Sequence, residues 1–232
     1  MTTSDIEVLR RHVDPAGLAV LDVGCGHGRL TRELTALGAH VTGMEISEQQ
    51  LAAARAADDG AGGRYIVGRA EAIPLADGSV DLVVFRASLH HVPVAQMRPA
   101  LADAARVLRP GGLVYAAEPL ATGAFYALVS IVDNEDEVRD AAQRALERAE
   151  TVGLTQVATE EYELEALVGD LDTLRRRMVA VDPARAAAFD AHRAELERRF
   201  VQLGEPGNDG RRFTEIMRAV VLRTNKREET PR

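Results

Sequence analysis

A short glycine-rich segment near the start of the chain has the residue types of a ligand-binding loop. The sequence from Asp22 to Gly28 reads DVGCGHG. Its first two residues are the last two of the apolar run Val20–Val23, and a segment of helical period follows it. Glycines let a ligand approach the main chain closely, and the following helix offers unpaired N–H groups and the positive end of its dipole. We therefore predict a strand, a binding loop and a helix in succession.

The spacing of the glycines excludes two common phosphate-binding loops. A dinucleotide fingerprint, G-x-G-x-x-G/A, would need glycine or alanine where the chain has Arg29 or Thr31. A P-loop needs a lysine after its last glycine, and the only lysine of the sequence is Lys226. Because the Asp22 carboxylate would repel a diphosphate, the loop suits a cationic group such as an amine or a sulfonium.

Two further segments add groups that suit an adenosine. Glu45 follows the next predicted strand, about 20 residues after the loop, where an acid accepts hydrogen bonds from both ribose hydroxyls. Ile46 is suited to cover a face of the base, and Glu71, which follows Ala70, is suited to accept from an exocyclic amine. These groups predict a ligand made of an adenosine and a zwitterionic, cationic tail.

With these residues the chain resembles the class I S-adenosylmethionine-dependent methyltransferases, specifically their small-molecule branch (methyltransferase type 11, UbiE-like). The resemblance runs from about Leu18 to Pro119, nearly half of the chain, and rests on five blocks in the same order. The blocks are the loop Asp22–Gly28, Glu45, the segment Ala70–Asp81, the strand that runs into Ser88-Leu89-His90-His91-Val92, and Arg106–Gly112. Five ordered blocks are far more specific than a glycine loop alone.

The resemblance implies S-adenosyl-L-methionine as cofactor, S-adenosyl-L-homocysteine as product, and no metal. It implies that Gly24 and Gly26 approach the methionine part and that Glu45 binds the ribose. Contacts with the adenine fall to Ala70 and Glu71, and Arg86 is expected at the edge of the cofactor. The full set of predicted cofactor-binding residues is Asp22, Gly24, Cys25, Gly26, Gly28, Glu45, Ile46, Ala70, Glu71 and Arg86.

His90 and His91 are the candidate catalytic residues, because they follow the fourth predicted strand on the side where open α/β sheets bind ligands. Methyl transfer from a sulfonium is an in-line displacement, so the protein must align nucleophile, methyl and sulfur in a dry pocket. A base helps where the acceptor must lose a proton. In the resembled family the second histidine is frequent whatever the substrate, which indicates a structural role for His91 and favours His90 on the substrate side. The alternative is that both histidines only shape the pocket.

Other side chains have two interpretations each. Glu118 either lines the acceptor site or anchors a loop, and Phe125 and Tyr126 fit the core better than a platform for the acceptor. We interpret Arg175–Arg177 as a solvated helical face, and Cys25 as a residue held by its loop rather than a nucleophile. No metal site is predicted, since the histidines outside the pair are isolated and form no ligand motif. These histidines are His12, His27, His40 and His192.

The composition argues against several classes of function. The chain has 232 residues and a net charge of -8, which disfavours nucleic acid and anionic membranes as partners. The longest apolar stretch, Ala124–Val132, is far shorter than a membrane span, and the first residues do not read as a signal peptide. The single cysteine rules out an intrachain disulfide. We predict a cytoplasmic monomer or homodimer whose partner is a small-molecule acceptor, with no nucleic acid and no membrane.

Strand-like runs alternate with helical periods, which predicts an α/β fold: a Rossmann-like, doubly wound, mostly parallel sheet with helices on both faces. The strands expected in the first half are Val20–Val23, His40–Met44, Arg64–Val67, Asp81–Phe85 and Leu113–Ala117. Beyond Pro119, helical segments are expected at Ala124–Val152, Leu171–Val179 and Pro183–Leu203, with strands at Thr155–Tyr162 and Phe213–Leu222. A helix expected over Val94–Leu108 should end at Arg109-Pro110-Gly111-Gly112, because proline and glycine break helices.

We predict a single methyltransferase domain over residues 1–232. Residues 18–119 are its cofactor-binding half, residues 120–212 are helical elaborations that form a substrate lid or a dimer interface, and residues 213–222 are the last strand. The acceptor pocket is expected from residues 1–17 and 119–212, where no motif identifies the acceptor.

The leading hypothesis is methyl transfer to O, N or C of a small molecule. A macromolecular acceptor is the second hypothesis. An enzyme that methylates adenine or glutamine nitrogen would carry Asn/Asp-Pro-Pro-Tyr/Phe after the fourth strand, where this chain has Arg86-Ala87-Ser88-Leu89. The third is a protein that binds S-adenosylmethionine without methyl transfer, as a regulator or as the catalyst of another reaction, because fold does not fix function.

Overall fold

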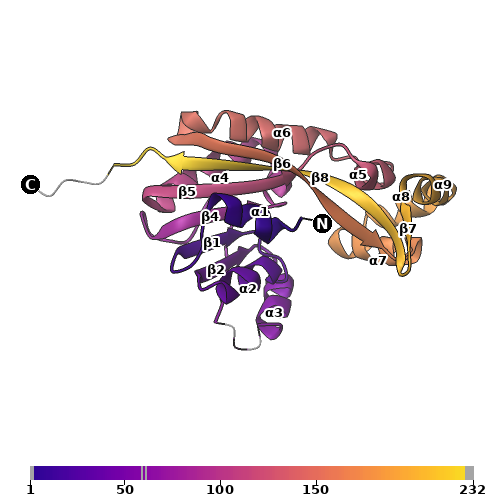
Figure 1. The fold of residues 1–232 in the computed structure, drawn as a ribbon, viewed down its shortest axis with the longest axis horizontal. Coiled ribbons are helices and arrows are strands. Elements are labelled where there is room, and N and C mark those ends of the chain that lie inside the picture. Colours follow the sequence, from indigo (N-terminus) through magenta and orange to yellow (C-terminus); the bar gives the residue numbers. More distant parts are fainter. Residues whose placement is uncertain (1–2, 59, 61, 228–232) are drawn as a thin grey trace, which may run out of the picture. The chain divides into compact units, whose positions relative to one another are not determined.

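The computed structural model describes residues 3–58, 60 and 62–227. Over these residues eight strands form one sheet in the order β3-β2-β1-β4-β5-β8-β6, with β7 paired to β8 (Figure 1). The strands are β1 (Ala19–Val23), β2 (His40–Glu45), β3 (Arg64–Val67), β4 (Val80–Arg86), β5 (Leu108–Pro119), β6 (Leu154–Val168), β7 (Glu205–Gly207) and β8 (Gly210–Thr224). β1 to β5 pair in parallel, and β7 pairs with β8 antiparallel. The predicted α/β fold is confirmed.

Helices connect the strands and follow β5. They are α1 (Asp5–His12), α2 (Arg29–Ala36), α3 (Glu48–Ala56), α4 (Val94–Val107), α5 (Ala124–Val129), α6 (Asp136–Glu147), α7 (Leu171–Val181), α8 (Arg185–Ala191), α9 (Arg193–Leu203) and the 3-10 helices η1 (Leu89–His91) and η2 (Ala149–Val152). Side-chain caps explain two of the starts. Ser4 accepts a hydrogen bond from Glu7 N before α1, and Ser47 accepts one from Gln50 N before α3.

β1 lies between β2 and β4, so the strand order reverses on either side of it. Right-handed crossovers that leave β1 and β4 in opposite directions place α2 and α3 on one face of the sheet and α4 on the other. Both faces of the central strands are therefore covered, which is why β1 and β4 are nearly continuous apolar runs.

The chain forms two compact units, each described here by itself. The sheet unit comprises residues 4–118, 141–160 and 218–232, and the helical unit comprises residues 1–3, 119–140 and 161–217. Most of the predicted elaboration over residues 120–212 falls in the helical unit, whereas residues 141–160 belong to the sheet unit.

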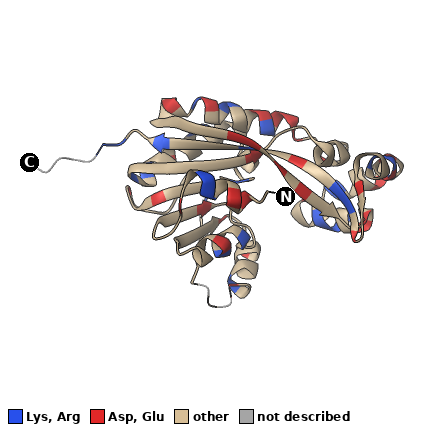
Figure 2. Cartoon of the chain, in the orientation of Figure 1, with Lys and Arg blue, Asp and Glu red and all other residues tan. Residues whose placement is uncertain are grey.

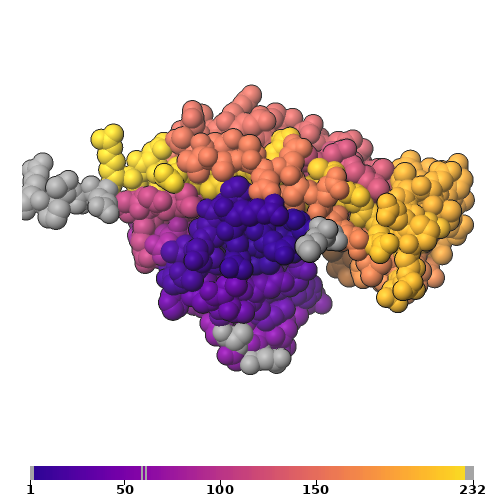
Figure 3. Space-filling view, in the orientation of Figure 1, coloured from indigo at the N-terminus to yellow at the C-terminus, as the bar shows by residue number. Residues whose placement is uncertain are grey.

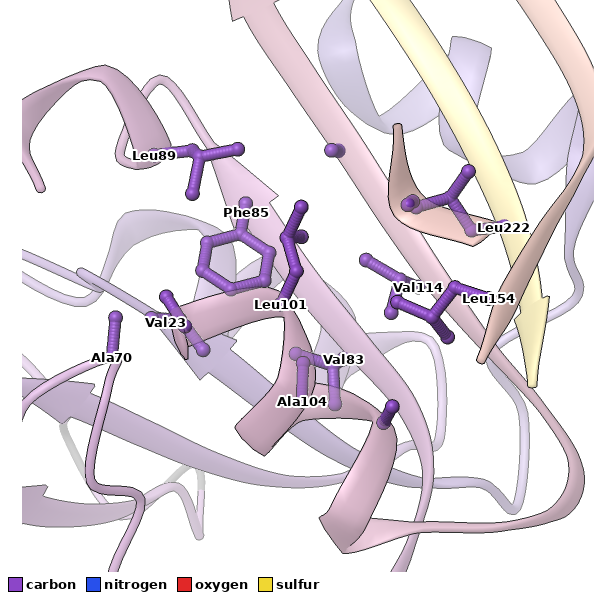
Figure 4. Packing of buried hydrophobic residues seen from close by; sticks show 14 of the residues in the cluster. Val23, Ala70, Val83, Phe85, Leu89, Leu101, Ala104, Val114, Leu154 and Leu222 are labelled. Carbon is purple, nitrogen blue, oxygen red and sulfur yellow. The ribbon is translucent and has the colours of Figure 1, made fainter. Parts of the chain in front are cut away.

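The main core of the sheet unit lies between the strands and α4. Figure 4 shows Val23, Val83 and Phe85 from β1 and β4 beside Leu101 and Ala104 of α4. Val83 and Phe85 are fully buried, and Leu101 is 1% exposed. This packing fixes the strand ends from which the loops of the candidate site leave.

The helical unit has a core of its own. Its buried apolar residues include Leu128 of α5, Leu174 of α7, Phe189 of α8 and Phe213 of β8. Phe125 packs against this cluster, and Tyr126 is buried under the Arg139 guanidinium, 4.5 Å from its ring centroid. The interpretation of both aromatics as core residues is confirmed.

Several elements differ from the sequence prediction. The helix expected over Pro183–Leu203 is divided into α8 and α9, and the strand expected over Thr155–Tyr162 runs on to Val168 as β6. Arg109–Gly112 ends α4 as expected but lies inside β5, which therefore begins at Leu108 with a register shift opposite β4. The helix expected over Ala124–Val152 is broken into α5, α6 and η2. Before α6, Asn134 Oδ1 accepts a hydrogen bond from Asp136 N at 2.9 Å and forms an Asx turn that leads into the helix. The predicted loop Gly204–Gly210 contains β7, which pairs with β8.

Candidate functional site

The candidate site lies at the carboxyl ends of β1 and β4, where the strand order reverses. In open α/β sheets, ligands bind outside the carboxyl ends of strands at such a reversal. The loop Gly24–Gly28 follows β1, and the segment Ala87–His91 follows β4. The sequence predicted both segments, and the structure brings them together.

The glycine loop is held close to its two neighbouring strands. The N–H groups of Gly24 and Cys25 both donate to the carbonyl of Met44 on β2, at 2.8 and 3.0 Å. A Cβ added to Gly24 would lie 2.7 Å from Cβ of Ser88, closer than side chains pack. Gly24 also has φ +72°, so alanine there would be strained in any case. The loop thus needs glycine at this position for two independent reasons.

Glu45 joins the end of β2 to the loop. Its Oε2 accepts a hydrogen bond from Gly26 N at 3.2 Å, and its Oε1 accepts from Ile46 N at 2.8 Å and from Ser47 N at 3.1 Å. Ile46 itself is 57% exposed. The Glu45 carboxylate therefore lies against the loop, with Ile46 next to it in the chain.

Asp22 is buried and Cys25 is half-buried, and burial shifts the pKa of each far from its usual range. Burial raises the pKa of Asp22 to about 6. The hydrogen bond that Thr31 Oγ1 donates at 2.7 Å and the positive charge of Arg86 both lower this pKa, but by less than burial raises it. Burial, together with the charges of Asp22 and Glu45, raises the pKa of Cys25 to about 12. A thiol with such a pKa is almost never a thiolate at neutral pH, which supports the interpretation of Cys25 as a residue that is not a nucleophile.

Ala70 and Glu71 lie in a loop after β3. Ala70 is 9% exposed, and Arg69 Nε donates to Glu71 Oε1 at 2.6 Å, which lowers the pKa of that carboxyl. The following segment is fixed from α4: Arg106 donates to the carbonyls of Ile73 and Leu75 at 2.8 and 2.9 Å. The sequence did not identify Arg106 as a support of this loop.

The end of β4 carries a strained residue beside an ion pair. Arg86 donates from Nε to Asp5 Oδ2 at 2.9 Å, and Asp5 on α1 is buried. α1 lies on the surface in Figure 3. Ala87 has φ +49° and is the one non-glycine residue with positive φ in the part of the chain that the structure describes. Such strain is typical of functional turns. The capping spacing Ser4-x-x-Glu7 is the signal that could have predicted α1 and thereby the partner of Arg86.

Glu118, at the end of β5, organises the segment after β4. It is fully buried and accepts hydrogen bonds from the N–H groups of Ser88, Leu89 and His90, at 3.0, 2.8 and 3.3 Å. Its Oε2 also lies 2.5 Å from His90 Nδ1. The loop-anchoring interpretation of Glu118 is confirmed, and the carboxylate fixes the His90 ring as well.

His91 and His12 lie in surroundings that differ from those of His90. His91 is exposed, and its ring centroid lies 4.0 Å from that of His90. His12, at the end of α1, pairs with Glu160 of β6, with 2.9 Å between Nε2 and Oε2. Of the two candidate catalytic histidines, His90 is the buried one, and the Glu118 carboxylate orients its ring.

Several comparisons relate this geometry to known proteins. Residues 21–116 match the family described as "Methyltransferase domain". A ubiquinone biosynthesis O-methyltransferase of Nitrosococcus oceani is 38% identical over 113 residues, which are 47% of this chain and 47% of that enzyme. The chain therefore matches about half the length of this curated relative.

Solved structures extend the likeness of the fold to nearly the whole chain. A candidate methyltransferase of Bacillus halodurans has a TM-score of 0.68 at 18% identity, over 95% of this chain and 98% of that one. A (4+2)-cyclase has a TM-score of 0.61 at 19% identity, over 94% of this chain and 79% of that one. At these identities the likeness establishes the Rossmann-like methyltransferase fold and no activity.

Proposed function

We propose that this chain, whose residues 21–116 match the methyltransferase domain family, is an enzyme that transfers a methyl group from S-adenosylmethionine to a small-molecule acceptor. The observation that carries the proposal is the hydrogen bond between Gly26 N and Glu45 Oε2, 3.2 Å long. This hydrogen bond holds the Glu45 carboxylate, which we assign to the ribose, against a glycine loop whose spacing and charge do not suit a diphosphate. S-adenosylmethionine, when bound, supplies an electrophilic methyl group on a sulfonium.

The residues of the site fit this cofactor. Ser88 Oγ is buried and has no hydrogen-bond partner among the described residues, which leaves a polar atom beside Gly24 for a ligand. Asp22 and Glu45 provide negative charge on either side of the loop, which suits a cationic amino acid. In the proposed assignment Gly24, Gly26, Cys25, Gly28 and Asp22 serve the methionine part.

We assign the binding of the nucleoside part to residues at the ends of the neighbouring strands. Glu45 binds the ribose hydroxyls, and exposed Ile46 covers a face of the adenine. Ala70 and Glu71 contact its edge, while Arg86 stays with Asp5 at the border of the site.

We assign the base to His90. A proton on Nδ1 that is donated to Glu118 leaves the lone pair on Nε2, so Nε2 is the atom that takes a proton from an acceptor hydroxyl or amine. Glu118 cannot rotate away, because three main-chain N–H groups hold it. We assign a structural role to exposed His91.

The acceptor atom is proposed to be oxygen, because the curated relative is named as an O-methyltransferase. The acid and base of the site serve nitrogen or an acidic carbon equally well. Among the described residues, no helix is long and apolar enough to cross a membrane. The cytoplasmic location, the lid and the monomeric or dimeric state stay predictions.

A second candidate function is binding of S-adenosylmethionine without methyl transfer. It is favoured by one observation: a chain with the same fold is a (4+2)-cyclase, whose named reaction is not a methylation. The His90–Glu118 pair fits proton transfer in either case.

Calorimetric titration of the purified chain with S-adenosylmethionine, S-adenosylhomocysteine and NAD, in parallel, tests the cofactor. Micromolar binding of the first two alone is expected, and binding of NAD alone would overturn the proposal. Release of S-adenosylhomocysteine in the presence of phenolic and other small acceptors then separates the two functions, because a protein that only binds the cofactor forms none.

A further inference from the structure

A groove of about 390 Å³ lies within the sheet unit, between α4 and the segment 141–152 that contains η2 and most of α6. None of its lining residues belongs to the proposed cofactor or catalytic set. We propose that this groove binds a small amphipathic carboxylate, an apolar chain with one anionic head, of the class of medium-chain fatty acids. The inference is independent of the proposed function.

The groove has an apolar floor that water wets poorly. Met97 and Leu101 of α4 and Ala149 of η2 line it and are 1%, 1% and 2% exposed. Val94, at its mouth, is 48% exposed. An apolar chain laid along this floor would also cover the exposed side chain of Val94 at the mouth and remove it from water.

The charged residues that line the groove are all basic. Arg98 comes from α4, and Arg144 and Arg148 come from α6 and the turn after it. Arg98 and Arg148 form no ion pair with any residue that the structure describes. Figure 2 shows acidic residues elsewhere on α6, but none of them lines the groove. In a protein of net charge -8, this local excess of guanidinium groups is complementary to an anion.

Size and lining select the class of ligand. A volume of about 390 Å³ falls at the small end of small-molecule sites, and is too small for a docked helix of a partner. No aromatic side chain lines the groove, so it offers no aromatic face to a nucleobase. Guanidinium groups pair with a carboxylate through two parallel hydrogen bonds, and the floor accepts the chain behind it.

Calorimetric titration of the full chain with decanoate, decanol and decyltrimethylammonium tests the proposal. Decanoate is expected to bind at one site at least tenfold more tightly than either analogue. The double variant Arg98→Gln/Arg148→Gln is expected to weaken decanoate binding by about tenfold or more and to leave decanol unchanged, because it removes two charge-assisted hydrogen bonds. Ala145→Phe, which fills the groove, is expected to abolish binding of both.

The matched control is Arg10→Gln/Arg64→Gln, which removes the same charge from exposed positions outside the groove and should bind decanoate like the parent. The proposal is overturned if decanoate binds no more tightly than decanol, or if the two double variants behave alike. If decyl phosphate or an acidic peptide binds more tightly than decanoate, the assignment of a fatty carboxylate as the ligand is overturned. Thermal melting of each variant identifies any loss that comes from unfolding.

Discussion

Nδ1 of His90 lies 2.5 Å from Oε2 of Glu118, and the two side chains are 4% and 1% exposed. The same carboxylate accepts three main-chain hydrogen bonds from the turn that carries the histidine. One buried acid at the end of β5 thus fixes both the backbone after β4 and the ring on it. The position of the proposed base depends on pairing between strands that are separate in the sequence.

Glu118→Gln is expected to lower the free energy of unfolding by about 2 kcal/mol. The amide keeps one acceptor oxygen, but its NH₂ group cannot accept, so buried N–H groups of Ser88 to His90 lose partners, at about 1–3 kcal/mol each. Urea denaturation measures the loss. An unchanged midpoint would mean that water replaces these hydrogen bonds and that the site is less dry than its burial indicates.

His90→Ala is expected to reduce turnover by about 10²- to 10⁴-fold, which is the usual contribution of a positioned base. The affinity for S-adenosylhomocysteine should survive, because no proposed cofactor contact is made by this ring. His91→Ala is the matched control, since it alters the exposed neighbour and should leave turnover within a few-fold of the parent. Retained turnover in His90→Ala would remove it as the base.

Much of the sheet unit could be predicted from the sequence because its signals are local. A glycine loop after an apolar run, and an acid after the next strand, each lie within a few residues, and the structure places Gly26 and Glu45 in contact. Glu118 could not be assigned a single role, since its partners lie 28 to 30 residues earlier in the chain. The support that Arg106 gives to the segment after Ala70 could not be predicted either, because these residues are also distant in the chain.

The break between α5 and α6 illustrates a different limit. Periodicity continues through residues 124–152, so the sequence predicts one helix, whereas the chain turns between α5 and α6, where Asn134 Oδ1 accepts a hydrogen bond from Asp136 N. Side-chain hydrogen bonds also explain why β5 begins at Leu108, although the sequence predicts a strand that begins at Leu113. Proline and glycine end α4, but Arg109 then donates to both oxygens of Asp81 at 2.7 Å and holds the same segment along β4. Side-chain hydrogen bonds of this kind override local propensity.

Gly26→Val is expected to weaken binding of S-adenosylhomocysteine by at least about tenfold, or 1.4 kcal/mol. Gly26 has φ +54°, and an added Cβ would lie 3.1 Å from Gln50 Oε1, so a branched side chain has no room beside the ligand. Gly26→Ala shares the backbone strain without the bulk and should lose less. Isothermal titration compares the three proteins, and unchanged affinity in the valine variant would move the ligand away from the loop.

Asp22 should make the stability of the protein fall as the pH rises from about 4 to 6. Burial raises its pKa to about 6 in the folded state, above the ordinary value of 3.8, so between these values the folded state binds more protons than the unfolded state. The integrated effect is at most about 3 kcal/mol. Asp22→Asn, which still accepts from Thr31, should lack this loss. Urea denaturation at pH 4 and pH 7 checks it, and parallel pH profiles for the two proteins would contradict the raised pKa.

Arg106→Gln is expected to weaken cofactor binding through the adenine alone. Arg106 donates to the carbonyls of Ile73 and Leu75, and Asp103 braces it at 2.6 Å, so its loss loosens the segment that follows Glu71. The readout is the ratio of affinities for S-adenosylhomocysteine and its inosine analogue, which lacks the exocyclic amine. A merely destabilised protein would lose both affinities in proportion, whereas a displaced Glu71 brings the ratio toward one. Asp77→Asn is the control: it removes a partner of Arg106 that is 76% exposed, and such surface ion pairs contribute little.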